Sequence, residues 1–463
     1  MSEAFTTVSP VDGRVYVERP FAGYAEVERA LALGDDAAGR WKRVPLEDRA
    51  AAVARWVDHL VAESDTLAEE LTWQMGRPIA QAPSELGGFE TRARTMIRLA
   101  PDALADTHLA PSEGLARFIR REPLGLVLVL APWNYPWLTS VNAVAPALLA
   151  GNAVLLKHSE QTPLVAERMS AAAREAGLPE GVLAHVHMAN ATTAAVVADR
   201  RVAFVCFTGS VEGGRAVQRA AAGRFVGVGL ELGGNDPAYV CEDAPVAATA
   251  AAVADGAFYN AGQSCCAIER VYVQRDRYDA FVDALCTEAR ALRLGDPRER
   301  ATTLGPMVRV SNAARVEAQV AGALRAGARD LLDDHAVEGA ARGLPYLAPR
   351  VIVDVDERVE LMREESFGPV VAVAPVRDDD EAVARMNDSR YGLTASVWTS
   401  DEARARHIGD RIDTRTLYMN RCDTLDPELP WVGVKDSGRG CSLSHLGFAQ
   451  LTRPKSFYLR RAP

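Results

Sequence analysis

The chain has 463 residues, a formal net charge of −10 and a pI near 5.5. At ~150 residues per domain, this length predicts two or three domains. The content of 48% hydrophobic and 25% charged residues is typical of a globular protein. The acidic balance argues against a nucleic-acid-binding protein, which normally carries a basic surface.

The N-terminal segment 1–20 lacks the basic and apolar regions of a signal peptide. No uninterrupted apolar run reaches the ~18 residues that a membrane span requires. The seven cysteines are an odd number without a CxxC pair, so they predict neither a disulfide framework nor a metal site. We therefore expect a cytoplasmic enzyme without a membrane partner.

Residues 25–96 carry apolar side chains three or four positions apart, which predicts amphipathic helices. Three later segments, 124–136, 152–163 and 202–220, each begin with an apolar run, pass through a polar loop and lead into a helix. Strands that alternate with helices predict a doubly wound parallel sheet, which binds ligands beyond the carboxyl ends of its strands. We expect the three polar loops to converge on one crevice.

A second set of short apolar segments begins after residue 233 and predicts another α/β domain. The last such segment, 454–460, follows no helix and stands alone in the pattern. We expect it to pair with the extended segment 117–122 or with another subunit.

Two adjacent thiols, Cys265 and Cys266, follow a Gly-Gln-Ser turn in YNAGQSCCAIER, residues 259–270. A thiol becomes nucleophilic when free backbone N–H groups, a helix N-terminus or a cation stabilises its thiolate. The turn favours a catalytic cysteine, yet most intracellular cysteines are buried packing residues. The residues alone leave both alternatives open.

Two glutamates are candidate functional carboxylates. Glu231 lies between two leucines and just before Gly233, in an apolar setting that raises the pKa of a carboxyl and suits a general base. Glu365 precedes Phe367 in a Gly-Pro turn that could present a carboxylate and an aromatic ring to a ligand. Taken alone, each residue is more often structural, Glu231 in a salt bridge at a strand end and Glu365 in a simple turn.

Two further segments suit a nucleotide. Gly209 and Ser210 open a helix whose free N–H groups and dipole favour phosphate. Lys157 and Glu160 follow a strand, where they could hold ribose hydroxyls. Neither segment contains the GxGxxG fingerprint, so each alone is weak evidence.

Taken together and in this order, these segments resemble the aldehyde dehydrogenase superfamily, from SPVDGRVY at residues 9–16 to LTRPKSFYL at residues 451–459. The resemblance implies an α/β fold of the aldehyde dehydrogenase type, with three parts. These are a Rossmann-type NAD-binding domain (1–103 and 124–233), an α/β catalytic domain (234–436) and a small β bridging element (104–123 and 449–462). The bridging element implies a homodimer or homotetramer.

In the family's pattern, Cys265 is the nucleophile because it falls two residues after the glutamine of GQSCCA, Glu231 is the general base, and Asn134 is the oxyanion-hole side chain. The resemblance also implies the residues that contact the cofactor, namely Trp133, Lys157, Glu160, Gly209, Ser210, Leu232, Glu365 and Phe367. The substrate pocket is expected to be lined by Tyr135, Trp137, Tyr259 and Cys266.

The implied reaction is the NAD-dependent oxidation of an aldehyde to a carboxylic acid through a Cys265 thioester, which a water activated by Glu231 hydrolyses. Glu160 favours NAD, because it would repel the additional phosphate of NADP, which is possible but less favoured. Two alternatives are a CoA-acylating dehydrogenase, which Glu231 disfavours, and a cofactor-free thiol esterase or binding protein.

Several positions depart from the commonest family pattern. Ala143 replaces a frequent lysine, and His187 and Met188 replace a frequent Thr-Gly pair. Tyr259 stands where enzymes acting on succinate semialdehyde often have an arginine. Together with the acidic loop 420–431, this tyrosine predicts an apolar, aromatic or amino-bearing aldehyde in preference to an anionic one.

Overall fold

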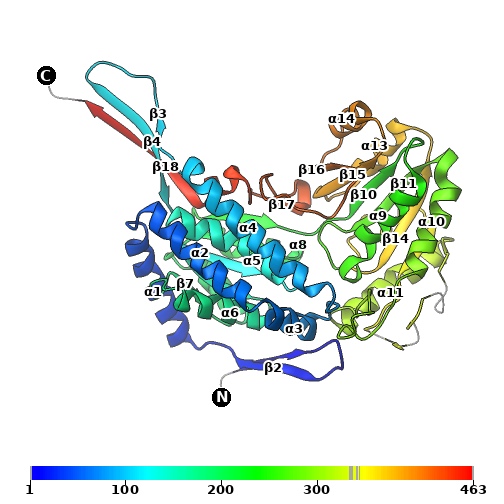
Figure 1. Cartoon of the computed structure of the whole chain (residues 1–463), viewed down its shortest axis with the longest axis horizontal. Coiled ribbons are helices and arrows are strands. Elements are labelled where there is room, and N and C mark those ends of the chain that lie inside the picture. The colour runs from blue at the N-terminus through cyan, green and yellow to red at the C-terminus, as the bar shows by residue number, and fades with distance from the viewer. Residues whose placement is uncertain (1–2, 333–336, 340–341, 344, 461–463) are drawn as a thin grey trace.

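The computed structural model describes residues 3–332, 337–339, 342–343 and 345–460, and two large sheets form its framework (Figure 1). The first sheet has the order β17-β9-β8-β5-β6-β7; neighbours from β9 to β7 are parallel and β17 is antiparallel. Its strands are β5 (Leu126–Ala131), β6 (Ala153–His158), β7 (Leu183–His185), β8 (Val202–Thr208), β9 (Gly227–Glu231) and β17 (Gly438–Arg439). All residues of β5 are buried, as expected of a parallel strand covered on both faces.

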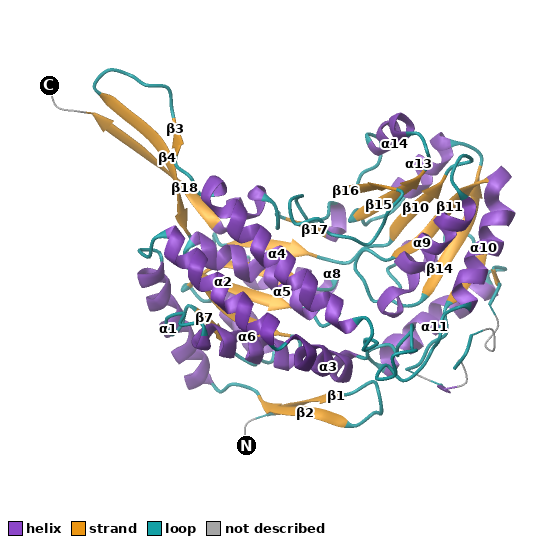
Figure 2. Cartoon of the chain, in the orientation of Figure 1, coloured by secondary structure: helices purple, strands orange, loops and turns teal. Residues whose placement is uncertain are grey.

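Helices cover the first sheet (Figure 2). One of them, α5, lies on strands β5 and β6, and α2 and α4 pack over α5. The helices of this part of the chain are α1 (Tyr24–Trp41), α2 (Leu46–Ala62), α3 (Ser64–Met75), α4 (Ala82–Ala103), α5 (Pro136–Ala150), α6 (Pro163–Glu175), α7 (Asn190–Ala198) and α8 (Val211–Ala221). The helices predicted within residues 25–96 are confirmed by α1 to α4.

The second sheet has the order β12-β13-β14-β11-β10-β15-β16, and all its pairs are parallel except β12 with β13. Its strands are β10 (Asp236–Val240), β11 (Ile268–Gln274), β12 (Arg329–Asp330), β13 (Arg350–Val353), β14 (Val370–Val376), β15 (Thr394–Trp398) and β16 (Thr416–Met419). Ala238 and Val240 pack into one apolar core and Tyr239 into another, so both faces of the sheet are buried. This arrangement confirms the second α/β unit expected after residue 233.

The second sheet has its own helices, and short 3₁₀ helices occur in both units. The α-helices are α9 (Val246–Phe258), α10 (Tyr278–Arg290), α11 (Val310–Arg325), α12 (Glu360–Arg363), α13 (Asp379–Asn387) and α14 (Glu402–Gly409). The 3₁₀ helices are η1 (Tyr259–Gly262), η2 (Arg275–Arg277), η4 (Lys435–Ser437) and η5 (His445–Leu451).

The C-terminal strand β18 (Thr452–Arg460) pairs antiparallel with β4 (Leu115–Pro123), and β3 (Thr107–His108) completes a three-stranded sheet that projects from the body (Figure 1). The pairing of segment 454–460 with 117–122 is thereby confirmed. The Phe118 and Phe457 rings stack with centroids 4.5 Å apart. Residues 461 and 462 of the expected bridging element lie outside the described residues. A separate hairpin joins β1 (Ala4–Val8) and β2 (Val15–Pro20).

Within the described ranges, no helix combines the length and apolarity needed to cross a bilayer. The same residues hold no group of three or more His, Cys, Asp or Glu side chains placed to share a metal ion. All seven cysteines lie in the described part of the chain, and each is a free thiol.

Candidate active site

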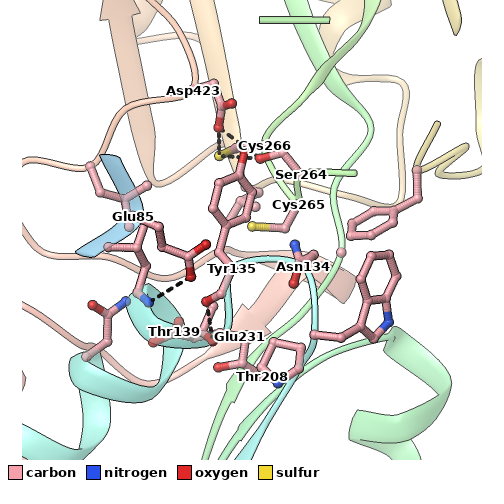
Figure 3. Close-up of a pocket in the computed structure, with 18 of the residues that line it drawn as sticks. Glu85, Asn134, Tyr135, Thr139, Thr208, Glu231, Ser264, Cys265, Cys266 and Asp423 are labelled. Atoms are coloured by element: carbon pink, nitrogen blue, oxygen red, sulfur yellow. Dashed lines mark hydrogen bonds between the residues drawn. The ribbon is translucent and has the colours of Figure 1, made fainter. Parts of the chain in front are cut away.

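A cavity of about 800 Å³ lies at the carboxyl ends of β5, β8 and β9, where doubly wound sheets bind ligands (Figure 3). Its wall also includes residues 264–266 and part of the loop 420–431. It brings together most of the residues singled out from the sequence, namely Trp133, Asn134, Tyr135, Gly209, Ser210, Glu231, Leu232, Tyr259, Cys265, Cys266, Glu365 and Phe367.

Three residues expected at the site are not on the cavity wall. Trp137 is 1% exposed, and its indole packs edge-on against Phe89 with ring centroids 5.9 Å apart, so its assignment to the substrate pocket is wrong. Trp137 lies in the first turn of α5, where its side chain faces α4 and not the cavity. Lys157 lies in β6 and Glu160 just beyond it, both half-buried and outside the cavity lining.

The loop that carries the two cysteines follows a tight left-handed turn. Asn260, Ala261 and Gly262 have φ values of 54°, 55° and 68°. A Cβ atom at Gly262 would lie 2.2 Å from the carbonyl oxygen of Gly368, so the close approach requires glycine. The next residue, Gln263, is buried and accepts a hydrogen bond from the Val308 amide at 2.8 Å. These contacts fix the backbone from which Cys265 projects.

The two adjacent thiols have different environments. Cys266 is 2% exposed, and its Sγ donates to Asp423 Oδ1 at 2.9 Å, an oxygen that also accepts from Ser264 Oγ at 2.8 Å (Figure 3). A hydrogen bond with the Cys265 thiol, burial and the Asp423 charge raise the pKa of Cys266 well above its usual value, so Cys266 stays a thiol. Both residues line the cavity, and Cys265 is the more exposed of the two.

Asn134 faces the cysteine loop from the end of β5. Its Nδ2 donates to the Gln263 carbonyl oxygen at 3.2 Å. Its own carbonyl oxygen accepts from Arg77 Nη2 at 2.6 Å and from Asn260 Nδ2 at 3.2 Å. The side-chain amide is therefore held as a donor next to the loop that carries Cys265.

Glu231 ends strand β9 on the same cavity. Burial raises the pKa of its carboxyl to about 7, while a hydrogen bond from the Ser442 hydroxyl and the positive charge of Arg92 act in the opposite direction. A carboxyl with this pKa is partly ionised at neutral pH and can take a proton from water.

A buried carboxylate, Glu269, holds the turn that carries Glu365 and Phe367. It accepts hydrogen bonds from the backbone amides of Ser366 and Phe367 at 2.9 Å and from Asn235 Nδ2 at 2.8 Å. The backbone of Phe367 has a φ of 54°. Its ring packs edge-on against the Trp133 ring, with the ring centroids 5.6 Å apart. The turn at 365–368 thus presents an aromatic ring to the cavity, as the sequence pattern suggested.

The residues around the opening of α8 fit a dinucleotide. Ser210 caps α8, accepting a hydrogen bond from the Gly213 amide at 3.1 Å, and the remaining free amides of this helix end suit a pyrophosphate. Glu365 accepts from the Gly234 amide at 3.0 Å, and a Cβ atom at Gly233 would lie 2.4 Å from its carboxylate oxygen. Burial and the neighbouring Glu269 raise the pKa of Glu365 to about 8. A partner rich in hydroxyls, such as a ribose, would satisfy this carboxyl.

The sequence model of the aldehyde dehydrogenase family matches residues 1–457. The chain belongs to the aldehyde dehydrogenase family. A succinate-semialdehyde dehydrogenase (NADP(+)) of Deinococcus radiodurans is 34% identical over 451 residues, which are 97% of this chain and 94% of the relative. A betaine aldehyde dehydrogenase of Cereibacter sphaeroides is 35% identical over 457 residues, 98% of this chain and 94% of the relative.

Solved structures agree with the sequence match. The crystal structure of an NAD-dependent aldehyde dehydrogenase from Sinorhizobium meliloti superposes with a TM-score of 0.95 at 33% identity, covering 100% of this chain and 92% of that one. The expected aldehyde dehydrogenase fold and the expected enzyme class, a nicotinamide-dependent aldehyde dehydrogenase, are thereby confirmed. The roles of the individual residues in this family member stay predictions.

Two charged residues of α4 that line the cavity were missed in the sequence. Glu85 is paired with Arg77, and Arg92 donates to the Leu138 carbonyl and to Asn142. Glu85 and Arg92 are seven positions apart and share the buried face of α4 with Phe89. Their spacing from the apolar residues of α4 places them on the same helix face, and this spacing is the feature of the sequence that indicates their inward direction.

The acidic loop 420–431 contributes less negative charge to the cavity than its composition suggested. Asp423 lines the wall, but its carboxylate is held by Ser264 and Cys266. Asp426 and Glu428 are exposed and lie outside the cavity lining, and Glu428 pairs with Arg98. The loop 420–431 therefore adds one carboxylate, Asp423, to the cavity wall, and the expected preference for an apolar, aromatic or amino-bearing aldehyde stays a prediction.

Proposed function

We propose that this aldehyde dehydrogenase oxidises its substrate to the carboxylic acid through a covalent Cys265 intermediate that a Glu231-activated water hydrolyses. One observation carries the proposal: Cys265, Asn134 and Glu231 line a single cavity. The neighbouring thiol of Cys266 is buried and bonded to Asp423, which favours Cys265 as the nucleophile.

In the first step, the Cys265 thiolate attacks the aldehyde carbon and the carbonyl oxygen becomes an oxyanion. The Asn134 amide and the Cys265 backbone N–H would donate to this oxygen. One such donor is typically worth ~2.7–4 kcal/mol of transition-state stabilisation. Asn134 suits the role because Arg77 and Asn260 hold its backbone carbonyl in place.

The tetrahedral Cys265 adduct must lose a hydride from the former aldehyde carbon to become a thioester, and the nicotinamide ring of the bound cofactor would supply the acceptor for that hydride. Trp133 and Phe367 would frame the ring, and Glu365 would accept hydrogen bonds from its ribose. Further contacts to the dinucleotide are assigned to Lys157, Glu160, Gly209, Ser210 and Leu232. Glu160 favours NAD over NADP by charge repulsion.

In the last step, Glu231 takes a proton from a water molecule, and the resulting hydroxide attacks the thioester carbonyl. The carbon–sulfur bond breaks, the acid leaves and the Cys265 thiolate is restored. A pKa of about 7 gives Glu231 a substantial carboxylate fraction at neutral pH without making it a weak base.

We also propose the domain division expected from the sequence and a role for the β3-β4-β18 sheet in a homodimer or homotetramer. Tyr458 and Leu459 of β18 are 69% and 52% exposed, and an apolar strand edge of this kind suits a contact with a second chain. The cytoplasmic location stays a prediction.

The formation of reduced cofactor, followed by absorbance with and without CoA, tests the proposal. Aldehyde-dependent reduction of NAD that does not require CoA, with the free acid as product, is the expected result. A requirement for CoA would favour the acylating alternative. Ester hydrolysis without any cofactor reduction would favour the thiol esterase.

A further inference from the structure

Arg92 is a buried cation on the wall of the cavity, and in the described part of the chain neutral hydrogen-bond acceptors hold it in place of an ion pair. It lies on α4 and is 8% exposed. Its Nη1 donates to the Leu138 carbonyl oxygen and to Asn142 Oδ1, both at 3.1 Å and both neutral acceptors. Among the described residues, no carboxylate forms an ion pair with Arg92, and Nε and Nη2 have no hydrogen-bond acceptor.

Two of the three other buried arginines illustrate ways in which this chain satisfies such a group. Arg77 pairs with the carboxylate of Glu85. Arg270 has no ion pair among the described residues, but its Nε, Nη1 and Nη2 all donate to acceptors in the protein. Arg92 differs from both, because part of its guanidinium faces the cavity with donors to spare. Burial lowers the pKa of Arg92, so an anion at this position would relieve an unfavourable environment.

None of the cavity carboxylates forms an ion pair with Arg92 within the described part of the chain. Glu85 is bonded to Arg77 and the Trp137 amide, and Asp423 to Ser264 and Cys266. The charges of Glu231 and Glu85 favour the protonated guanidinium through space, as do those of the Cys265 and Cys266 sulfurs, which indicates that the guanidinium lies near the reacting centre.

Resting on the function proposed above, we propose that Arg92 binds a carboxylate carried by the aldehyde, so that the substrate is a short oxo acid with its aldehyde at Cys265. A planar guanidinium with two free donor positions matches the two oxygens of a carboxylate. Thr139 and Asn142 add polar groups to the same wall. This proposal departs from the expectation of a non-anionic substrate, which was drawn from Tyr259 and the loop 420–431, because the cation comes from α4 and not from the segment before Cys265.

Steady-state kinetics with matched substrates test the proposal. The probes are ω-oxo carboxylic acids of three to six carbons, alkanals of equal length, an amino-bearing aldehyde and a phosphorylated aldehyde. We expect the wild-type enzyme to show its highest kcat/KM with one of the oxo acids. In Arg92→Gln, the ratio of kcat/KM for that oxo acid to kcat/KM for its alkanal should fall by about 10- to 100-fold, mainly through KM. Arg92→Lys should recover part of the ratio.

Arg94→Gln is the matched control, because Arg94 lies on the exposed face of the same helix and pairs with Glu90 and Asp58. This control should leave the ratio unchanged. An equal loss for oxo acid and alkanal in Arg92→Gln would overturn the proposal and assign Arg92 a structural role or an effect on Glu231. A wild-type preference for the amino-bearing or phosphorylated aldehyde would overturn it as well.

The same kinetic panel distinguishes a failure of the proposed function from a failure of the role assigned to Arg92. Without the proposed function, no aldehyde in the panel would reduce the cofactor to give a free acid. A binding measurement adds an independent readout: calorimetry with the oxo acid's product, a dicarboxylate, should give a Kd about 10- to 100-fold weaker in Arg92→Gln than in the wild type. Unchanged binding would contradict the assignment.

Discussion

The side-chain nitrogen of Asn134 lies 3.2 Å from the carbonyl oxygen of Gln263, two residues before Cys265. Two segments far apart in the chain thus place an amide donor beside the reactive loop. Among the described residues, the acceptor of this donor is that neutral carbonyl, which the oxyanion of the proposed first step would replace. A charged acceptor strengthens such a hydrogen bond, so under the proposed mechanism the interaction would grow as the reaction proceeds.

The first prediction concerns this donor. Asn134→Ala should lower kcat by about 100- to 1000-fold, because one oxyanion-hole donor is lost. Stopped-flow measurement of cofactor reduction should place the loss in the acylation step. Asn312→Ala is a control on the wall of the same cavity, in α11 and outside the cysteine loop, and it should change kcat much less. Equal defects would show that Asn134 acts through general packing.

The second prediction concerns the paired thiols. Cys265→Ala should abolish aldehyde oxidation, whereas Cys266→Ala should retain turnover, because the Cys266 thiol is directed to Asp423 and not to the cavity centre. Modification by a substoichiometric alkylating agent, mapped by mass spectrometry, should label Cys265 first. Preferential labelling of Cys266, together with equal loss of activity in both variants, would reverse the assignment.

Much of the fold could be predicted from the sequence because the local signals agree with the tertiary structure. Strand β5 is a continuous apolar run and is buried on both faces. The site was predicted less completely. Arg92 lies in a helix that the apolar spacing predicts. A charged residue of such a helix is normally assigned to the solvent-exposed face, unless its position is compared with the spacing of the apolar residues.

Two further features of the site, the contact of Ser442 with Glu231 and the direction of the Trp137 side chain, depend on tertiary structure and not on local sequence. Ser442 reaches Glu231 across 211 residues of chain, so no local pattern connects them. Trp137 was expected to line the pocket, but the start of α5 turns its indole toward Phe89. Side-chain direction at a helix start depends on the packing of the whole element.

The third prediction is a pH dependence. Glu231 acts as a base only as a carboxylate, so the rate of thioester hydrolysis should fall as the pH drops below about 7, by roughly tenfold per pH unit. Ser442 donates a hydrogen bond that stabilises the carboxylate. Ser442→Ala should therefore raise the pKa of Glu231 and move this limb to higher pH.

Single-turnover rates of acid release between pH 5 and 9 would measure the shift, with circular dichroism to verify that the variant is folded. A limb that stays at the same pH in Ser442→Ala would mean that another group controls hydrolysis.

The fourth prediction is a preference for NAD over NADP. Repulsion between Glu160 and a ribose phosphate should be worth about 1–4 kcal/mol, or roughly one to three decades of affinity. Glu160→Ser should raise kcat/KM for NADP and lower it for NAD. A positive charge on His187 would compensate for the repulsion between Glu160 and the phosphate. Its Nε2 lies 3.0 Å from Oε1 of Glu167, which also accepts a hydrogen bond from Arg19.

Glu175→Ser, an exposed change on the neighbouring helix α6, serves as the control for this preference. It should leave the ratio of the two kcat/KM values unaltered. A wild-type enzyme that favours NADP would contradict the role assigned to Glu160.

The central claim is that Cys265 carries an acyl group that Glu231 helps to hydrolyse, and a direct test is to trap that group. Glu231→Gln, mixed with aldehyde and NAD and quenched with acid, should give one burst of reduced cofactor and then a slow steady rate. Peptide mass mapping of the quenched protein should find the acyl mass on Cys265, and the adduct should be absent from the Cys265→Ala, Glu231→Gln double variant. An adduct on Cys266, or continued rapid acid formation with no adduct on Cys265, would contradict the account.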